Sequence, residues 1–354
     1  MSGGTRAPTR VSGGQAAPGR FGRAGFPVAW ILVAVLTLVC VALATALLLD
    51  DESAPRAGGA TGAAAREPAG RVVGFPIPVG DAPSAVGAGY ESVWVLHEGS
   101  GTLATLDPTS NKLVGAPIAI GGRPRFMTIA AGAVWVSSFD ANTVTRVSTG
   151  ARTVTDRIPV GRSPLGIAVA SGAVWVVNHD DDTIQQISTA TARVVGKPIK
   201  VGEAPVSATY GSGSVWVTNS QDDTVSRVDL SARAVVETIP VGDHPEGLMV
   251  GAGDVWVANV EDDTVMRIDP TTNRVVRTIR VGSRPLHLRI SGPEVWVPNS
   301  GDGTLTAIDV ATNRVVGAPV QIGRSVERVG SGFGSVWAAS AAEDTVTRVE
   351  RTPR

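Results

Sequence analysis

The stretch EGLMVGAGDVWVANVEDDTVMRIDPTTNRVVRTIRV, residues 246–281, decides the fold. It holds four short runs of β-branched and apolar residues, and Gly, Pro, Asn and Asp, which favour turns, separate each run from the next. The pattern predicts four antiparallel strands, at 246–250, 254–259, 264–269 and 274–281. The run VWV does not alternate between apolar and polar residues, which indicates a strand that is buried on both faces.

This stretch is one copy of a repeat. Val-Trp pairs occur seven times, and successive tryptophans from Trp94 to Trp337 lie 41, 40, 41, 40, 40 and 41 residues apart. A second marker, the Ile or Val that opens each IPVG-like segment, follows the same spacing from Ile77 to Val320. A period near 40 residues with four strands per copy is typical of β-propellers. The sequence therefore predicts an all-β, seven-bladed β-propeller.

The two ends of the repeat region predict how the ring closes. The first strand, Arg71–Val79, aligns with the fourth strand of the other copies, and the last, Thr345–Glu350, aligns with the third. The seventh blade thus lacks one strand, which the N-terminal segment supplies. We expect this pairing to remove two open sheet edges at once, so that residues 71–354 form a propeller closed by its N-terminal strand.

The first seventy residues differ from the repeats in composition. Residues 1–26 carry four arginines and no acidic residue, residues 27–49 are uncharged and apolar, and residues 50–70 form an Ala/Gly-rich linker that opens with three carboxylates. The apolar run is long enough to span a bilayer, and its flanking charges predict a cytoplasmic N-terminus. We expect one transmembrane helix, a signal anchor in the cell membrane, with an extracytoplasmic propeller. The alternative is a signal peptide cleaved near 44–46.

Charge and cysteine content limit the partners. The formal net charge is −1 and no basic stripe interrupts the repeats, so we expect no nucleic-acid binding. The single cysteine, Cys40, lies in the apolar run, so the propeller has no disulfide. We expect a monomer whose stability comes from packing and strand pairing.

The repeat resembles a known family. The pattern VG-x-x-P, VWV-x-N, T-V-x-R-I-D is carried in the fifth copy by Val241-Gly242, Pro245, Val255-Trp256-Val257, Asn259 and Thr264-Val265. It is similar to the YVTN-type β-propeller repeat family over about residues 71–350. Relatives of that family include binding and surface proteins as well as propellers with streptogramin-lyase or lactonase activity. The resemblance therefore implies the fold and leaves both a binding role and an enzyme acting at the channel mouth open.

Structural roles account for the most repetitive polar and aromatic residues. The seven repeat tryptophans share one register, which indicates core packing between blades rather than an aromatic cage. The acidic turns, such as Asp180-Asp181-Asp182, could suggest calcium, but they lack EF-hand spacing and Asp favours hairpin turns. His97 and His179 end second strands, where a turn role is expected. Motifs of common hydrolases, nucleotide-binding loops and zinc sites are absent.

The segments that enter each blade differ in charge from copy to copy. Strand order places them on one face, the top face, together with the turns between second and third strands, while first strands line the central channel. We expect ligand contacts there, from Arg123, Arg125, Arg162, His244, Glu246, His287 and Glu327.

The same residues bear on the enzyme alternative. Streptogramin lyases use a histidine and an acid near the channel mouth with a magnesium ion, and this chain aligns only loosely with that set. We therefore expect a membrane-anchored binding module for a protein, peptide or polysaccharide, with no metal, cofactor or catalytic residue. A lyase or lactonase is the alternative.

Overall fold

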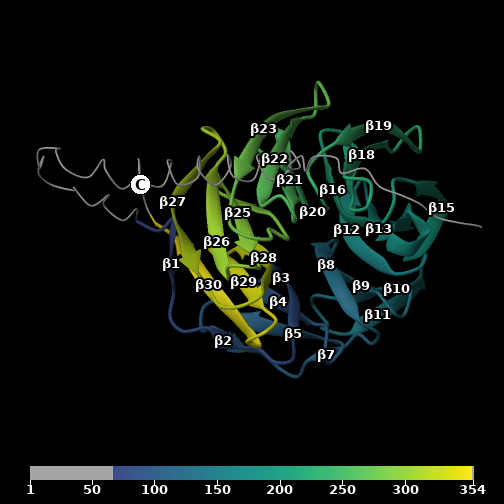
Figure 1. Ribbon diagram of the computed structural model, residues 1–354. Helices are drawn as coiled ribbons and strands as arrows, with labels where there is room; N and C mark the ends of the chain where they lie inside the picture. The colour runs from purple at the N-terminus through teal and green to yellow at the C-terminus, as the bar shows by residue number, and fades with distance from the viewer. Residues whose placement is uncertain (1–66, 353–354) are drawn as a thin grey trace, which may run out of the picture. The chain divides into compact units, whose positions relative to one another are not determined.

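The computed structural model describes residues 67–352, which form seven antiparallel sheets around a central channel (Figure 1). The predicted all-β, seven-bladed β-propeller is confirmed. The segments predicted as tail, transmembrane helix and most of the linker, at 1–26, 27–49 and 50–70, lie outside the described residues up to position 66. Within 67–352, no helix is long and apolar enough to cross a membrane.

Each blade contributes an inner strand to the channel and a second strand outside it. The inner strands are β3 (Pro83–Gly89), β8 (Pro124–Ala130), β12 (Pro164–Ala170), β16 (Pro205–Gly211), β20 (Pro245–Gly251), β24 (Arg289–Ser291) and β28 (Val326–Gly332). The second strands are β4 (Ser92–His97), β9 (Ala133–Ser138), β13 (Ala173–Asn178), β17 (Ser214–Asn219), β21 (Asp254–Asn259), β25 (Glu294–Asn299) and β29 (Ser335–Ser340).

The third and fourth strands complete each blade toward the rim. The third strands are β5 (Thr102–Asp107), β10 (Thr143–Ser148), β14 (Thr183–Ser188), β18 (Thr224–Asp229), β22 (Thr264–Asp269), β26 (Thr304–Asp309) and β30 (Thr345–Arg351). The fourth are β6 (Lys112–Leu113) with β7 (Ile118–Ala119), β11 (Val154–Pro159), β15 (Arg193–Lys200), β19 (Ala234–Pro240), β23 (Arg274–Arg280), β27 (Arg314–Gln321), and β1 (Gly70–Val72) with β2 (Ile77–Pro78). A 3-10 turn spans His179–Asp181.

The ring closes as the sequence predicts. Both β1 and β2 pair with β30, in a register that places Gly70 opposite Arg351 and Ile77 opposite Val346. The predicted single strand is interrupted between β1 and β2. A further contact precedes β1, because the backbone of residues 67–69 exchanges hydrogen bonds of 3.1 and 3.3 Å with Ala318 of β27. The N-terminal segment therefore ties blade seven to blade six.

The cores lie between blades. All seven repeat tryptophans are at most 1% exposed, and each packs with residues from the adjoining blade. Trp337 of blade seven, for example, packs with Val93 and Val95 of blade one and with Ile77. Because each sheet is covered on both faces by its neighbours, the VWV run is apolar throughout. The tryptophans are core, as expected.

Polar contacts repeat on both faces of the ring. On the bottom face, an arginine of a third strand stacks on its own blade's tryptophan and reaches the next blade. Arg227, for example, lies 4.9 Å from the Trp216 ring and donates to the Asn273 side chain at 2.7 Å. The near-identical bottom turns therefore also join blades.

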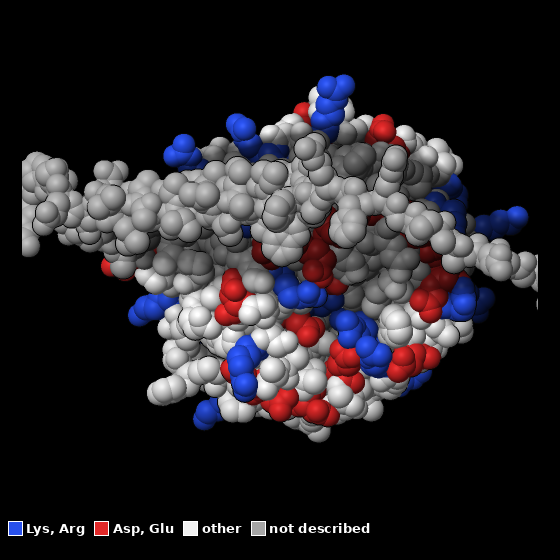
Figure 2. Space-filling model, in the orientation of Figure 1, with Lys and Arg blue, Asp and Glu red and all other residues white. Residues whose placement is uncertain are grey.

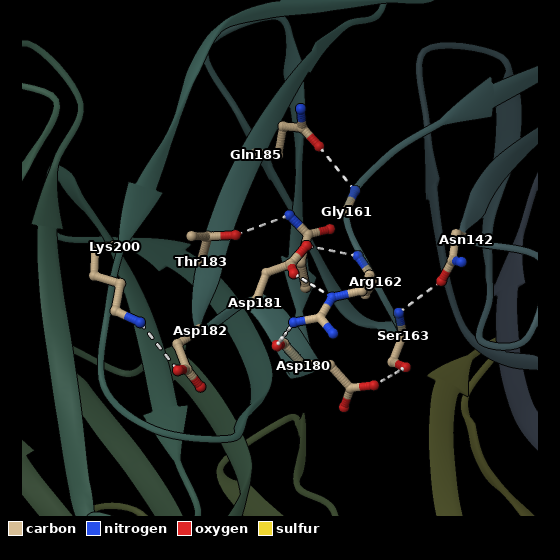
Figure 3. A network of polar contacts seen from close by, with 11 residues as sticks. Asn142, Gly161, Arg162, Ser163, Asp180, Asp181, Asp182, Thr183, Gln185 and Lys200 are labelled. Atoms are coloured by element: carbon tan, nitrogen blue, oxygen red, sulfur yellow. Dashed lines mark hydrogen bonds and ion pairs between the residues drawn. The ribbon is translucent and has the colours of Figure 1, made fainter.

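On the top face, the acidic turns join neighbouring blades. In blade four, Asp222 accepts a hydrogen bond from the Glu203 backbone N–H of its own blade at 2.6 Å. The next residue, Asp223, accepts one from the His244 N–H of blade five at 2.9 Å. Figure 3 shows the equivalent turn of blade three, where Asp181 binds the backbone and side chain of Arg162. These carboxylates join backbone loops, as the turn interpretation expects.

Candidate functional site: the mouth of the central channel

Three of the predicted site residues share one register position, the second residue of an inner strand. Arg125 of β8, Glu246 of β20 and Glu327 of β28 each follow the first residue of the strand. Their charges act on one another, since Arg125 and Glu246 both contribute to the pKa of Glu327. We call these three residues, with His287 and Arg328, the channel cluster. Blades two, five, six and seven thus contribute to one site.

Arg125 and Arg123 are already paired inside the protein. One guanidinium nitrogen of Arg125, Nη1, donates to both carboxylate oxygens of Glu98, at 2.9 and 2.8 Å, and the Arg123 Nε donates to the same carboxylate at 2.5 Å. Burial alone would raise the pKa of Glu98, but the hydrogen bonds and charges of the two arginines outweigh it and lower that pKa. Two of the expected ligand contacts are therefore engaged with Glu98, which sequence reasoning missed.

Two other predicted site residues do not belong to the channel cluster: Arg162 lies away from it, and His244 pairs with its member Glu246. The Arg162 side chain is 67% exposed and binds Asp181 and the Asp180 backbone (Figure 3). His244 lies 3.5 Å from the Glu246 carboxylate, whose hydrogen bond raises the His244 pKa. The structure therefore concentrates the candidate site at the channel and leaves Arg162 on the rim.

Arg328 is the central cation of the cluster, and sequence reasoning also missed it. Its guanidinium carbon lies 3.5 Å from the centre of the Phe126 ring. Burial lowers the pKa of Arg328 to about 10, so the group stays charged at neutral pH. No described residue makes a hydrogen bond with this guanidinium. The sequence does contain a signal for this residue. Arg328 is the third residue of its inner strand, where blades three and five have Gly166 and Gly247.

His287 lies in a break of the inner strand of blade six, not on that strand as the sequence predicted. Only Arg289–Ser291 form β24, whereas the inner strand of each other blade has seven residues. Burial, and then the charges of Arg328 and Arg289, lower the pKa of His287 well below its usual value. Its Nδ1 is buried and has no hydrogen-bond partner. The imidazole is therefore neutral at pH 7 and has a free ring nitrogen.

Gly247 of β20 permits the position of His287. A Cβ at residue 247 would lie 3.0 Å from the His287 Cα and from the Leu286 carbonyl oxygen, closer than side chains normally approach. Blades five and six therefore meet backbone to backbone beside the cluster.

A cavity of about 150 Å³ adjoins the cluster inside the channel. One wall is built from small residues of β3, including Ala85, Gly87 and Ala88, and another from Phe126 and Met127 of β8. His287, Arg289 and Arg328 line the remaining side. The site thus combines small and apolar residues of β3 and β8 with the polar side chains of His287, Arg289 and Arg328.

Outside the channel, charge on the visible face is mixed. Figure 2 shows positive and negative side chains of the described residues interspersed on that face, without a broad field of one sign.

The remaining histidines have structural contacts. His97 takes the place of the asparagine that ends other second strands, and its Nδ1 lies 3.1 Å from the Thr102 hydroxyl. Asn219 makes the same contact with Thr224 at 2.9 Å. The His179 Nδ1 lies 3.0 Å from the Pro205 carbonyl oxygen. These positions fit the expected turn roles.

The channel cluster does not fit the magnesium ion that a streptogramin-lyase resemblance implies. Among residues 67–352, no three His, Cys, Asp or Glu side chains lie close enough together to hold a metal ion. The histidine is flanked by two arginines whose charges lower its pKa and would repel a divalent cation. A protein cation, Arg328, stands among the glutamates instead.

Solved structures share the fold. A virginiamycin B lyase from Staphylococcus aureus superposes with a TM-score of 0.70 at 16% identity, over 80% of this chain and 100% of that one. A streptogramin B lyase has a TM-score of 0.68 at 18% identity, over 80% and 97%. The hydrazine synthase of Kuenenia stuttgartiensis has a TM-score of 0.69 at 15% identity, over 79% and 97%.

Such low identities establish the fold alone, and the three structures include two lyases and a hydrazine synthase. No curated protein matches the chain. The model of the virginiamycin B lyase family, however, matches residues 70–325, which is more than half of the sequence. The chain therefore belongs to the virginiamycin B lyase family.

Proposed function

We propose that this propeller is a ligand-binding module that takes a small molecule, or the end of a larger one, in its central channel below the top mouth. The observation that carries the proposal is the convergence on one cavity of two polar groups with unused hydrogen-bonding capacity. These groups are the Nδ1 of His287, which is buried without a hydrogen-bond partner, and the guanidinium of Arg328, which lines the same cavity and makes no hydrogen bond with the described residues. Buried polar groups normally have partners, so the free Nδ1 of His287 beside an open cavity indicates that a ligand supplies one.

Ion pairs on the top face reduce the number of charged residues that are available to a ligand. Arg123 and Arg125 are held by Glu98, and Arg162 by Asp181. These arginines shape the mouth or stabilise loops, and a ligand would have to break an existing ion pair to use them. Among the expected contacts, His287 lines the cavity, whereas Glu246 is paired with His244 and Glu327 precedes the lining residue Arg328.

The test is a binding screen with the full-length chain in detergent, by thermal shift, against carboxylic acids, short peptides and oligosaccharides. A true ligand should raise the melting temperature of the parent and of Arg162→Ala alike. It should have no effect on His287→Ala. A ligand that binds His287→Ala as well as the parent while Arg162→Ala fails to bind would place the site on the rim and overturn the proposal.

We also propose that residues 27–49 anchor the propeller in the cell membrane with residues 1–26 in the cytoplasm. The support is the uncharged 23-residue run and the arginine and carboxylate flanks in the sequence. Carbonate washing should leave the protein in the membrane pellet, and protease added to intact cells should digest the propeller. A soluble mature form beginning near residue 45 would show a cleaved signal peptide instead.

A second candidate function is bond cleavage at the same site, as a lyase or lactonase. The observation in its favour is the depressed pKa of His287, which makes a neutral imidazole available as a general base beside a fixed cation. A related solved structure is a virginiamycin B lyase described as catalytically inactive after one histidine was replaced by alanine, with quinupristin.

The two chemistries have different products. With a cyclic substrate, elimination opens the ring at unchanged mass, whereas hydrolysis adds one water. Incubation with quinupristin followed by liquid chromatography and mass spectrometry distinguishes them, with His287→Ala as the control. Binding without a new product would leave the binding module as the function.

A further inference from the structure

We infer that Arg328 is the anchoring cation of a metal-independent site for a small organic carboxylate with a ring-sized apolar body. This inference rests on the proposed function, and it specifies the ligand class.

The guanidinium N–H groups of Arg328 are not used within the protein. Among the arginines that surround the channel, Arg123 and Arg125 bind Glu98, and the Nε of Arg289 donates to the Ser331 hydroxyl at 3.2 Å. Arg328 has only the face of its guanidinium engaged, on the Phe126 ring. Its N–H groups point from the edge of that plane, and no described residue accepts from them. A guanidinium edge matches a carboxylate with two parallel hydrogen bonds.

The charge balance favours an anion. Four arginines, at 123, 125, 289 and 328, face three glutamates, at 98, 246 and 327. Burial raises the pKa of Glu327, and the hydrogen bond to Glu246 raises the pKa of His244. The arginines outnumber the glutamates by one, so an incoming carboxylate meets a net positive charge from these seven residues.

The cavity sets the size of the apolar part. Its volume is about 150 Å³, and Ala85, Ala88, Met127 and Ile129 contribute to its lining. A cavity of about 150 Å³ is large enough for one benzene ring. A carboxylate attached to a ring would place its charge at Arg328 and its body against these side chains. A bulky polymer chain would have to remain outside the channel.

The site needs no metal ion to bind an anion. In a magnesium-dependent site, the metal would neutralise the ligand and the protein would supply carboxylates to hold the metal. Here the protein supplies the cation as a side chain, and that cation repels a divalent ion from the positions next to His287. Within the described residues, the donor set for a metal is also missing.

The experiment measures the affinity of benzoate for the full-length chain in detergent by isothermal titration calorimetry, with benzamide and benzylamine as neutral and cationic analogues. Empty micelles correct for partitioning. We expect benzoate to bind at least tenfold more tightly than either analogue, with no change on adding EDTA or magnesium chloride. Tighter binding of benzylamine, or benzoate binding that requires magnesium, would overturn the inference.

The variants are Arg328→Gln and Arg328→Lys, with Arg324→Gln as the matched control. Arg324 belongs to the same blade, and its side chain is 82% exposed on the rim. Arg328→Gln should weaken benzoate binding about tenfold or more, because it removes the charge. Arg328→Lys keeps the charge without the planar edge and should be intermediate, while Arg324→Gln should bind like the parent. Equal affinity of the parent and Arg328→Gln would refute the role of Arg328.

Folding is checked by thermal unfolding, and Arg328→Lys remains informative if Arg328→Gln fails to fold. The result also separates the two proposals. A screened ligand that needs His287 and Glu246 but not Arg328 would overturn this inference and leave the binding module intact. If no ligand depends on His287 either, both proposals fail.

Discussion

Blades five and six have closely similar second and third strands but different inner strands. In blade five, β20 runs over Pro245–Gly251 and pairs with β21 along its length. In blade six, β24 is reduced to Arg289–Ser291, and Pro285 keeps only an isolated bridge to Asn299. The difference teaches that a blade keeps its core without a full inner strand, since Val295, Trp296 and Val297 of β25 stay fully buried. The inner strand is then free to vary where it lines the channel.

A single residue explains the break. The second strand of blade six reads EVWVPN, with Pro298 where blade five has Ala258. The Leu286 N–H still donates to the Pro298 carbonyl at 3.2 Å, but proline has no N–H to return the bond. The ladder therefore opens at the following residue, His287. The indole N–H of Trp296 is also without a partner, whereas that of Trp256 donates to the Gly251 carbonyl at 3.3 Å.

The largest expected effect tests the shared part of the two blades. Trp256→Ala and Trp296→Ala should each lower the free energy of unfolding by about 3–5 kcal/mol, because each removes a fully buried indole from the packing between blades. Urea unfolding monitored by circular dichroism measures both. If Trp296→Ala cost far less than Trp256→Ala, blade six would be loosely packed throughout and the comparison would fail.

The strands that repeat were predictable from the sequence, whereas the contacts of the variable inner strands were not. The second and third strands repeat their residues, so period, strand order and closure were all predictable from positions such as Trp256 and Thr264. Contacts across the channel were not predictable from the sequence. Glu98 and Arg125 lie in different blades, and nothing local in the sequence links Arg328 to Phe126, because the closed ring brings them together. Pro298 was visible as a departure from the repeat, but its effect on His287 depends on which strand pairs with which.

The next effect tests whether both blades depend on the acidic turns. Asp263 accepts a hydrogen bond from the Arg284 backbone N–H, which joins blade five to blade six. Asp263→Ala should lower the free energy of unfolding by about 1 kcal/mol. The matched control is Glu261→Ala in the same turn, whose pair with Arg284 joins two side chains that are about half exposed and so contributes little. Equal effects of the two variants would argue against a joining role for Asp263.

A smaller effect tests the cause of the break. Pro298→Ala restores a backbone donor opposite Leu286, so β24 should extend toward residue 286. Hydrogen exchange of the amides at 286–289 should slow, and the free energy of unfolding should rise by up to about 1 kcal/mol. The corresponding change at the regular blade, Ala258→Pro, should lower stability and speed exchange in β20. Unchanged exchange in Pro298→Ala would mean that another feature holds His287 out of the strand.

The last effect is a pH dependence that differs between blades five and six. Burial, together with Arg328 and Arg289, lowers the pKa of His287 in the folded state below the ordinary value of 6.5. Above pH 6.5 the imidazole is neutral in both states, and its titration does not affect stability. As pH falls below 6.5, the unfolded chain binds a proton that the folded state resists. The free energy of unfolding then declines by at most about 1.4 kcal/mol per pH unit until the folded pKa is reached.

His287→Gln should remove this decline. Its stability relative to the parent should therefore increase between pH 6.5 and 5, and the difference should be flat above pH 7. His244 of blade five gives the opposite dependence of stability on pH, because its pKa is raised, mainly by its hydrogen bond to Glu246. Its contribution is present below the unfolded pKa and is lost as pH rises through the folded pKa, so His244→Gln should lose stability relative to the parent at acidic pH. Denaturant unfolding of the three proteins from pH 5 to 8 measures both slopes. Parallel curves for the parent and His287→Gln would show that the imidazole titrates freely, and that the cluster does not hold it neutral.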